Sequence, residues 1–226
     1  MQRKIITTSD GSKTIRIEGW EEQYHSKHGA IGEAYHVFIK HGLNLFKNRT
    51  VRIMEIGFGT GLNALISWKE AASLGINIDY VGVEAYPVTV EEVGQLNYIS
   101  ILDALNFEAG FWSMHSSPWG TAIDIAPNFR LCKRQQDFRD IDDNESFDLV
   151  YFDAFGAQVQ PELWTVEIFQ KMYRALKSNG VLVTYAAKGS VRRAMQEVGF
   201  RVERLQGPPG KREMLRATKE LPRPQC

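Results

Sequence analysis

Apolar and polar positions along this chain follow two different periods, and the changes of period predict strands and helices. Two short β-prone runs, 3–8 and 13–18, flank a Ser-Asp-Gly-Ser turn and predict a β-hairpin. Apolar residues then recur at helical spacing over 30–46. Beyond residue 50, strand-like runs alternate with helical patterns. The predicted strands are 51–56, 78–84, 129–133, 147–152 and 181–186, and the predicted helices are 62–74, 88–98, 165–176 and 190–198.

This alternation predicts a parallel sheet with helices on both faces. The Ser-Asn-Gly segment at 178–180 is expected to end one helix, and 200–205 with 212–218 predict a closing antiparallel pair. Five strand–helix units followed by such a pair correspond to a Rossmann-like, seven-stranded α/β fold. We expect an N-terminal extension over 1–48, made of the hairpin and a helix, and a main domain over 49–226 with an aromatic-rich insertion near 100–128.

The composition is that of an ordinary globular protein, since 43% of the 226 residues are hydrophobic and 24% are charged. No apolar run is long enough for a transmembrane helix, and the first residues lack the apolar core of a signal peptide, so no membrane association is expected. The two cysteines, Cys132 and Cys226, lie far apart, which favours a reducing, cytoplasmic location. The five histidines lack the spacing of a metal site, so no metal is expected.

The charged residues are balanced in total but unevenly distributed. The net charge is zero, from 27 basic and 27 acidic residues. Residues 137–167 contain nine acidic residues and one arginine, whereas 188–223 contain ten basic and four acidic residues. This asymmetry is compatible with a polyanion that docks on the C-terminal part of the chain, and equally with an ordinary mixture of solvated charges.

A glycine-rich turn follows the first predicted parallel strand. Gly57, Gly59 and Gly61 form a G-x-G-x-G pattern, with Glu55 two residues before it and Asn63 two residues after it. Alternate glycines let the backbone turn sharply and approach a ligand closely. The dinucleotide fingerprint has a different spacing, G-x-G-x-x-G. The pattern is typical of class I methyltransferases that use S-adenosyl-L-methionine (SAM), so we expect these five residues in a cofactor site.

Ligands of open α/β sheets bind at the carboxyl ends of the strands, so polar residues at those ends are candidates for one site. Glu84 ends the second parallel strand, and its carboxylate suits the hydroxyls of a ribose; the alternative is a cap on the next helix. Asp137 and Phe138 follow the third strand. They suit the adenine amino group and ring, or Asp137 is simply a helix cap.

Asp153 directly follows the apolar strand 147–152, at a position that packing explains poorly. We expect it beside the cofactor and predict that it is the catalytic residue. An amine accepts a methyl group only through its free lone pair, and a carboxylate orients the amine and helps to remove its proton. A carboxylate-lined site also favours the positive sulfonium of SAM.

Several blocks of the sequence together resemble the methyltransferase module of the MnmC family. They are Asp153-Ala-Phe-Gly-Ala-Gln-Val-Gln-Pro-Glu-Leu-Trp164, Gly189-Ser-Val-Arg-Arg193, Gly199-Phe200, Lys211-Arg-Glu-Met-Leu215 and a weaker block at 24–39. The similarity extends over about residues 11–218. Two positions depart from the family pattern: Ala157 stands where proline is usual, and Val159 where lysine is common.

The resemblance implies SAM-dependent N-methylation of the 5-aminomethyl group of the wobble uridine, in the anticodon loop of tRNA, giving 5-methylaminomethyl-(2-thio)uridine. It implies a stand-alone methyltransferase, because the chain has no room for the FAD-dependent oxidase domain of two-domain members. The wobble base has to leave its stack to reach Asp153, and Phe155 and Trp164 are expected to flank it. The candidate phosphate contacts are Lys188, Arg192, Arg193, Lys211 and Arg212.

Two other interpretations stay open. A small-amine methyltransferase or an aminopropyltransferase shares the glycine turn and the strand-end acids but does not need the basic C-terminal segment. A non-catalytic tRNA-binding module with a relict pocket would not be stabilised by SAM.

Overall fold

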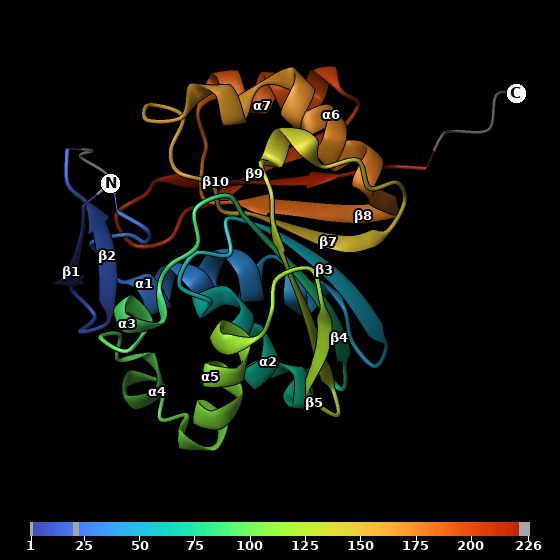
Figure 1. The fold of residues 1–226 in the computed structure, drawn as a ribbon. Coiled ribbons are helices and arrows are strands. Elements are labelled where there is room, and N and C mark those ends of the chain that lie inside the picture. The colour runs from blue at the N-terminus through green and yellow to red at the C-terminus, as the bar shows by residue number, and fades with distance from the viewer. Residues whose placement is uncertain (1, 20–22, 222–226) are drawn as a thin grey trace, which may run out of the picture.

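The computed structural model describes residues 2–19 and 23–221. A mixed sheet forms the centre of the molecule, and helices pack on both of its faces (Figure 1). The strand order is β5-β6-β4-β3-β7-β8-β10-β9. The strands are β3 Thr50–Ile56, β4 Asn77–Glu84, β5 Ala122–Ala126, β6 Phe129–Gln135, β7 Phe147–Phe152, β8 Leu176–Thr184, β9 Arg201–Gln206 and β10 Glu213–Thr218.

The five central strands, from β6 to β8, pair in parallel, and the strands at the two edges pair antiparallel. Without β5, the order is that of the predicted seven-stranded fold, and the predicted fold class is confirmed. β5 is an eighth strand that forms a hairpin with β6. It comes from the aromatic-rich insertion, whose place in the sheet the sequence pattern does not predict.

Each central strand contributes to two apolar cores, because successive side chains point to opposite faces of a sheet. In β7, Leu149 and Tyr151 face the core that contains α2 (Leu62–Leu74) and α5 (Glu108–Ser116). Val150 and Phe152 face the opposite core, with α6 (Val166–Ala175) and α7 (Gly189–Glu197). Figure 1 shows α6 and α7 on one side of the sheet and α2 and α5 on the other. All residues of β7 are buried, as expected for a central parallel strand.

Three predicted helical features differ from the observed ones. The predicted helix 30–46 begins as α1 (Ala30–Ala34) but continues as a π-helix, Tyr35–Lys40, and a 3₁₀ turn, Leu43–Leu45. The predicted helix 88–98 is wrong: two short helices, α3 (Val90–Val93) and α4 (Tyr98–Ile101), stand there. The helix stop at 178–180 is also wrong, since α6 ends at Ala175 and these residues lie in β8, where Asn179 and Gly180 bond to the backbone of Lys219.

The predicted N-terminal hairpin is confirmed as β1 (Arg3–Thr7) and β2 (Lys13–Ile17), which pair antiparallel. Asn97 fastens the hairpin to the rest of the protein, because its side chain accepts from the Lys13 amide at 2.8 Å and donates to the Gly11 carbonyl at 3.0 Å. The hairpin therefore sits beside α3 and α4 (Figure 1), and Arg3 of β1 contacts the loop that follows β4.

Candidate functional site

The carboxyl ends of β3, β4 and β7 meet at one edge of the sheet and open into a cavity. We call it the donor cavity. It contains Glu55, Glu84 and Asp153 together with the glycine turn, and the segment Asp137–Arg139 lies on its wall. The sequence-predicted cofactor residues are thus brought together, apart from Gly61, which begins α2 as its N-cap.

The backbone conformation of the turn requires glycine at two of its positions. Gly57 has φ 91°, and a Cβ there would lie 2.8 Å from the carbonyl oxygen of Asp153. Gly59 has φ 49°, and a Cβ there would lie 2.9 Å from the Tyr24 ring. Both positions combine a left-handed backbone with a neighbour that leaves no room for a side chain. The turn therefore brings bare backbone to the wall of the cavity.

Asn63, in the first turn of α2, connects two of the strand-end acids. Its Nδ2 donates to Glu55 Oε1 and to Asp153 Oδ2, both at 2.8 Å. Tyr80 donates to the other oxygen of Glu55 at 2.8 Å. Among the described residues, Asn63 Oδ1 has no hydrogen-bond partner although it is buried. A buried amide oxygen without a partner in a cavity wall is suited to accept a hydrogen bond from a ligand.

The two carboxyl groups that Asn63 joins have raised pKa values. Burial, and then the charge of Asp153, raises the pKa of Glu55 well above its usual range. Burial and then the charge of Glu33 raise the pKa of Asp153 to about 7, against the hydrogen bond from Asn63 and the positive charge of Lys211. Asp153 is therefore able to exchange a proton near neutral pH, which a general base requires.

Glu84 has both carboxylate oxygens directed at backbone amides: Oε2 accepts from Gly59 at 3.0 Å and Oε1 from Tyr86 at 2.9 Å. Burial raises the pKa of Glu84, and the hydrogen bonds from these two amides lower it. Since a carboxylate oxygen accepts two hydrogen bonds, each retains one position for a ligand hydroxyl. The arrangement suits the vicinal hydroxyls of a ribose.

Asp137 caps the 3₁₀ turn Phe138–Asp140, which is one of the two roles that the sequence allows for it. Its carboxylate accepts from the Arg139 amide at 2.9 Å and pairs with the guanidinium at 2.7 Å, which lowers its pKa. It still lies on the wall of the donor cavity beside the buried ring of Phe138. An adenine contact by these two residues stays a prediction.

A second cavity adjoins the first at Asp153, and we call it the acceptor cavity. Tyr24, Asp153 and Phe155 line both cavities. The rings of Tyr24 and Phe155 meet edge to face, with centroids 5.0 Å apart. Glu33 and Lys211 also line the acceptor cavity. Asp153 therefore stands at the junction of two spaces, one of which contains all the strand-end acids.

The residues predicted to contact a nucleic acid are not all at the surface. Trp164 is buried, and its Nε1 donates to the Phe155 carbonyl at 2.7 Å, so it fixes the backbone of the loop that follows Asp153. Lys211 is held within the acceptor cavity, where Nζ lies 2.6 Å from Glu33 Oε2. Lys188, Arg193 and Arg212 are exposed, and Arg192 is half-buried.

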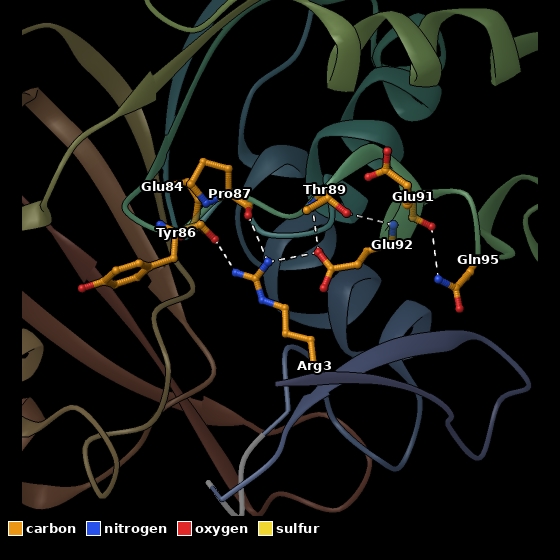
Figure 2. A network of polar contacts seen from close by, with 8 residues as sticks. All are labelled: Arg3, Glu84, Tyr86, Pro87, Thr89, Glu91, Glu92 and Gln95. Carbon is orange, nitrogen blue, oxygen red and sulfur yellow. Dashed lines mark hydrogen bonds and ion pairs between the residues drawn. The ribbon is translucent and has the colours of Figure 1, made fainter. Parts of the chain in front are cut away.

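Sequence reasoning missed several residues that the structure adds to the site: Tyr24, Glu33, Tyr185 and Arg3. Tyr24 and Glu33 lie in the N-terminal block of similarity, which was a signal for the region but not for the residues. Arg3 lies on β1, and Figure 2 shows its guanidinium among groups of the loop after Glu84. It donates to the carbonyl of Tyr86 at 2.6 Å, to that of Pro87 at 3.0 Å and to Glu92 at 3.1 Å.

These residues fit SAM. The donor cavity offers bare backbone at the glycine turn, carboxylate positions at Glu84 for hydroxyl donors, and the unpartnered amide oxygen of Asn63 for the ammonium of the amino-acid tail. In the described ranges no group of three or more His, Cys, Asp or Glu side chains is arranged to hold a metal ion. Nor does any helix there reach the length and hydrophobicity needed to cross a membrane.

Comparisons with known proteins agree with this geometry. A family model described as S-adenosyl-L-methionine-dependent methyltransferase matches residues 129–220. Two proteins called tRNA 5-methylaminomethyl-2-thiouridine biosynthesis bifunctional protein MnmC are similar: that of Burkholderia thailandensis is 28% identical over 93% of this chain, and that of Nitrosospira multiformis is 29% identical over 89%. The chain spans about a third (34%) of the length of each.

Among solved structures, MnmC2 from Aquifex aeolicus superposes with a TM-score of 0.76 and 25% identity, covering 98% of this chain and 71% of that one. Spermidine synthase from Thermotoga maritima superposes with a TM-score of 0.57 and 15% identity, covering 97% of this chain and 69% of that one, which shows the fold alone. The predicted resemblance to the methyltransferase part of MnmC is confirmed, and SAM is the cofactor that the matching family model names.

Proposed function

We propose that this chain transfers a methyl group from SAM to the amine of a 5-aminomethyl group on the wobble uridine of tRNA, giving 5-methylaminomethyl-(2-thio)uridine. The observation that carries the proposal is the position of Asp153, which lines both the donor and the acceptor cavity. The similarity to proteins named for 5-methylaminomethyl-2-thiouridine biosynthesis supports the choice of acceptor. A reaction on tRNA also implies a cytoplasmic location.

Asp153 is the residue that prepares the amine. When bound, SAM supplies a methyl group on a positively charged sulfur. The carboxylate of Asp153 accepts a hydrogen bond from the amine and directs its lone pair towards the donor cavity. A pKa of about 7 lets Asp153 take up the proton that the amine loses. Most of the rate gain comes from holding the two reactants in line.

The acceptor cavity suits a base that has left its stack. Tyr24 and Phe155 present aromatic surface on its wall, and flipped or single-stranded bases are commonly held between such side chains. Its rim also carries Arg16 and Lys27, both exposed. With the predicted phosphate contacts Lys188, Arg192, Arg193 and Arg212, these cations complement the backbone of an RNA.

The rival functions differ in what they require. A small-amine methyltransferase or an aminopropyltransferase needs the donor cavity and Asp153, but its turnover is independent of the basic residues around the acceptor cavity. A non-catalytic tRNA-binding module needs the basic residues and has no reason to bind SAM. The buried, hydrogen-bonded acids of the donor cavity favour a protein that binds the cofactor.

Methyl transfer to defined tRNA tests the proposal. The protein is incubated with SAM carrying a labelled methyl group and with tRNA whose wobble uridine bears the 5-aminomethyl group, and the nucleosides are analysed by mass spectrometry. We expect 5-methylaminomethyl-uridine with wild-type protein and none with Asp153→Asn. The same tRNA with an unmodified wobble uridine is the control. Labelling of polyamines or free amines, with no labelling of the tRNA, would instead support the first rival.

A further inference from the structure

An ion pair between distant parts of the chain lies on the acceptor side of Asp153 and has no role in the reaction described above. Lys211 Nζ lies 2.6 Å from Glu33 Oε2, and the Glu33 side chain is only 9% exposed. The other oxygen of Glu33 accepts from the Ser26 amide at 3.2 Å. Both oxygens of this carboxylate are thus held, which fixes the direction in which Lys211 reaches.

A second set of contacts ties Lys211 to the neighbourhood of Asp153. The ammonium of Lys211 stands over the Tyr185 ring, 3.7 Å from its centroid. The Tyr185 hydroxyl donates to the carbonyl of Ala154, the residue after Asp153, at 2.8 Å. Asp153, Glu33, Tyr185 and Lys211 all line the acceptor cavity. The positive charge is therefore held on the wall of the same cavity as the reactive carboxylate.

The two charges act on Asp153 in opposite directions. The negative charge of Glu33 raises its pKa and the positive charge of Lys211 lowers it, both on top of the larger effect of burial. Charges in a partly buried site are screened less than at the surface, so each has an effect large enough to measure. The two charges nearly cancel when both are present, but either one alone would shift the pKa of Asp153.

Other titratable and charged groups also face Asp153, and they are the same in wild type and in every variant of this pair. On the core side, Glu55 faces it through Asn63, and Tyr80 lies behind Glu55. From the segment after β2 come Tyr24 and His25; burial lowers the pKa of His25 to about 4, so it is neutral at pH 7. The remaining titratable or charged residues of the cavity wall are Arg16, Lys27 and His28.

We infer that Lys211 and Glu33 are opposed positioning residues for Asp153: Lys211 keeps the carboxylate ionised for the incoming amine, while Glu33 both anchors Lys211 and limits its effect. Neither residue touches the reacting atoms. This assignment moves Lys211 from the predicted set of phosphate contacts to the acceptor site, and it adds Glu33, which no sequence pattern singled out. The inference rests on the proposed function, because it concerns the base of that reaction.

The test is the pH dependence of single-turnover methyl transfer at saturating SAM and saturating aminomethyl-uridine tRNA, from pH 5.5 to 9. Lys211→Met should move the midpoint up by about one pH unit, and Glu33→Gln should move it down by a similar amount. Glutamine keeps one oxygen that accepts from Lys211, while its NH₂ group replaces the oxygen that accepts from the Ser26 amide, so the contact with Lys211 is retained and that with Ser26 is lost. Lys211→Arg keeps the charge and should leave the midpoint near that of wild type.

The double variant Lys211→Met with Glu33→Gln gives the sharpest result, because removing one charge of each sign should return the midpoint close to the wild-type value. Lys47→Met and Glu108→Gln, at exposed positions that line neither the donor nor the acceptor cavity, are the matched controls. Calorimetric titration with SAM and thermal melting establish that each variant is folded and binds the cofactor.

Opposite displacements of the midpoint support the inference. Equal loss of rate at every pH, with an unchanged midpoint in both single variants, overturns it and leaves the ion pair with a structural role only. A wild-type protein that transfers no methyl group to the aminomethyl-uridine tRNA overturns the proposed function instead, so the two failures are distinguishable.

Discussion

The amide of Asn63 donates one hydrogen bond to Glu55 and a second to Asp153, each 2.8 Å long. Glu55 lies near the end of β3, and Asp153 directly follows β7, the neighbouring parallel strand. The amide comes from the first turn of α2. One NH₂ group has two hydrogens and serves both carboxylates. The position of the predicted catalytic acid is therefore coupled to the wall of the donor cavity through a single side chain.

Asn63→Ala should destabilise the protein by about 1–3 kcal/mol, because two buried carboxylates lose their shared donor. The loss should be larger at pH 8 than at pH 5. At pH 8 more of Asp153 is ionised than at pH 5, and a buried carboxylate without its donor costs more than a buried carboxylic acid. Urea unfolding at the two pH values measures this. Asn44→Ala, at an exposed position, is the control; a loss independent of pH would show that the amide does not balance these charges.

Asp153→Asn should abolish methyl transfer and at the same time stabilise the protein at pH 8. Burial, the largest cause, raises the pKa of Asp153 in the folded state to about 7, above its usual 3.8. Between these values the folded protein binds more protons than the unfolded chain, so its stability falls as pH rises through this window.

Asparagine carries no charge, so burying it avoids the cost of burying the carboxylate, and its side-chain oxygen still accepts from Asn63 Nδ2. We expect a gain on the order of 2 kcal/mol at pH 8, or about 4–8 °C in Tm, and little gain below pH 4. Thermal melts across pH 4–8 measure it. A gain of equal size at both ends of that range would mean that ionisation of Asp153 is not its cause, and retained methyl transfer would remove Asp153 from the mechanism.

Glu84→Gln should weaken SAM binding by about tenfold to a hundredfold, since one of its two carboxylate oxygens becomes an NH₂ group that faces a backbone amide. Both oxygens are in use, towards Gly59 and Tyr86. Isothermal titration calorimetry with SAM is the direct measurement. Glu91→Gln is a matched control on the same segment, because Glu91 is exposed and does not line the donor cavity. Unchanged affinity in the Glu84 variant would assign that acid to loop structure alone.

The parts of the site that the sequence predicts are those that follow directly from a strand. Glu55, Glu84 and Asp153 each end or follow an apolar run, and parallel strands bring their carboxyl ends to one edge. The predicted helix 62–74 has the observed bounds of α2, and glycines stand at both of its ends, Gly61 as N-cap and Gly75 as C-cap. Such local patterns can be recognised in the sequence without knowing which residues they contact in the folded protein.

Contacts between distant segments are the parts that no local pattern contains. Lys211 and Glu33 are 178 residues apart, and their pairing depends on how the sheet brings α1 next to the loop before β10. A basic residue in a basic segment gives no sign that it turns inward. The Ser-Asn-Gly segment at 178–180 reads as a helix end, but pairing with the segment after β10 makes it part of a strand.

The final prediction concerns Arg3, whose guanidinium joins the N-terminal hairpin to the loop that follows Glu84 (Figure 2). It also lies 5.8 Å from the centroid of the Tyr24 ring, which stands against the glycine turn. Arg3 thus connects two walls of the donor cavity without lining it. Its side chain is only 12% exposed, so the contacts are shielded from water and from salt.

Arg3→Gln should raise the KM for SAM by about three- to tenfold, as expected for the loss of one or two charge-assisted hydrogen bonds that position a binding loop, and should leave kcat near the wild-type value. Arg3→Lys keeps the charge opposite Glu92 but cannot reach both carbonyls in one plane, so it should restore the activity only in part. Arg201→Gln, which breaks an exposed ion pair with Glu220, is the control. A fall in kcat at unchanged KM would place the effect of Arg3 on the reacting atoms and would contradict a role in holding the walls of the donor cavity together.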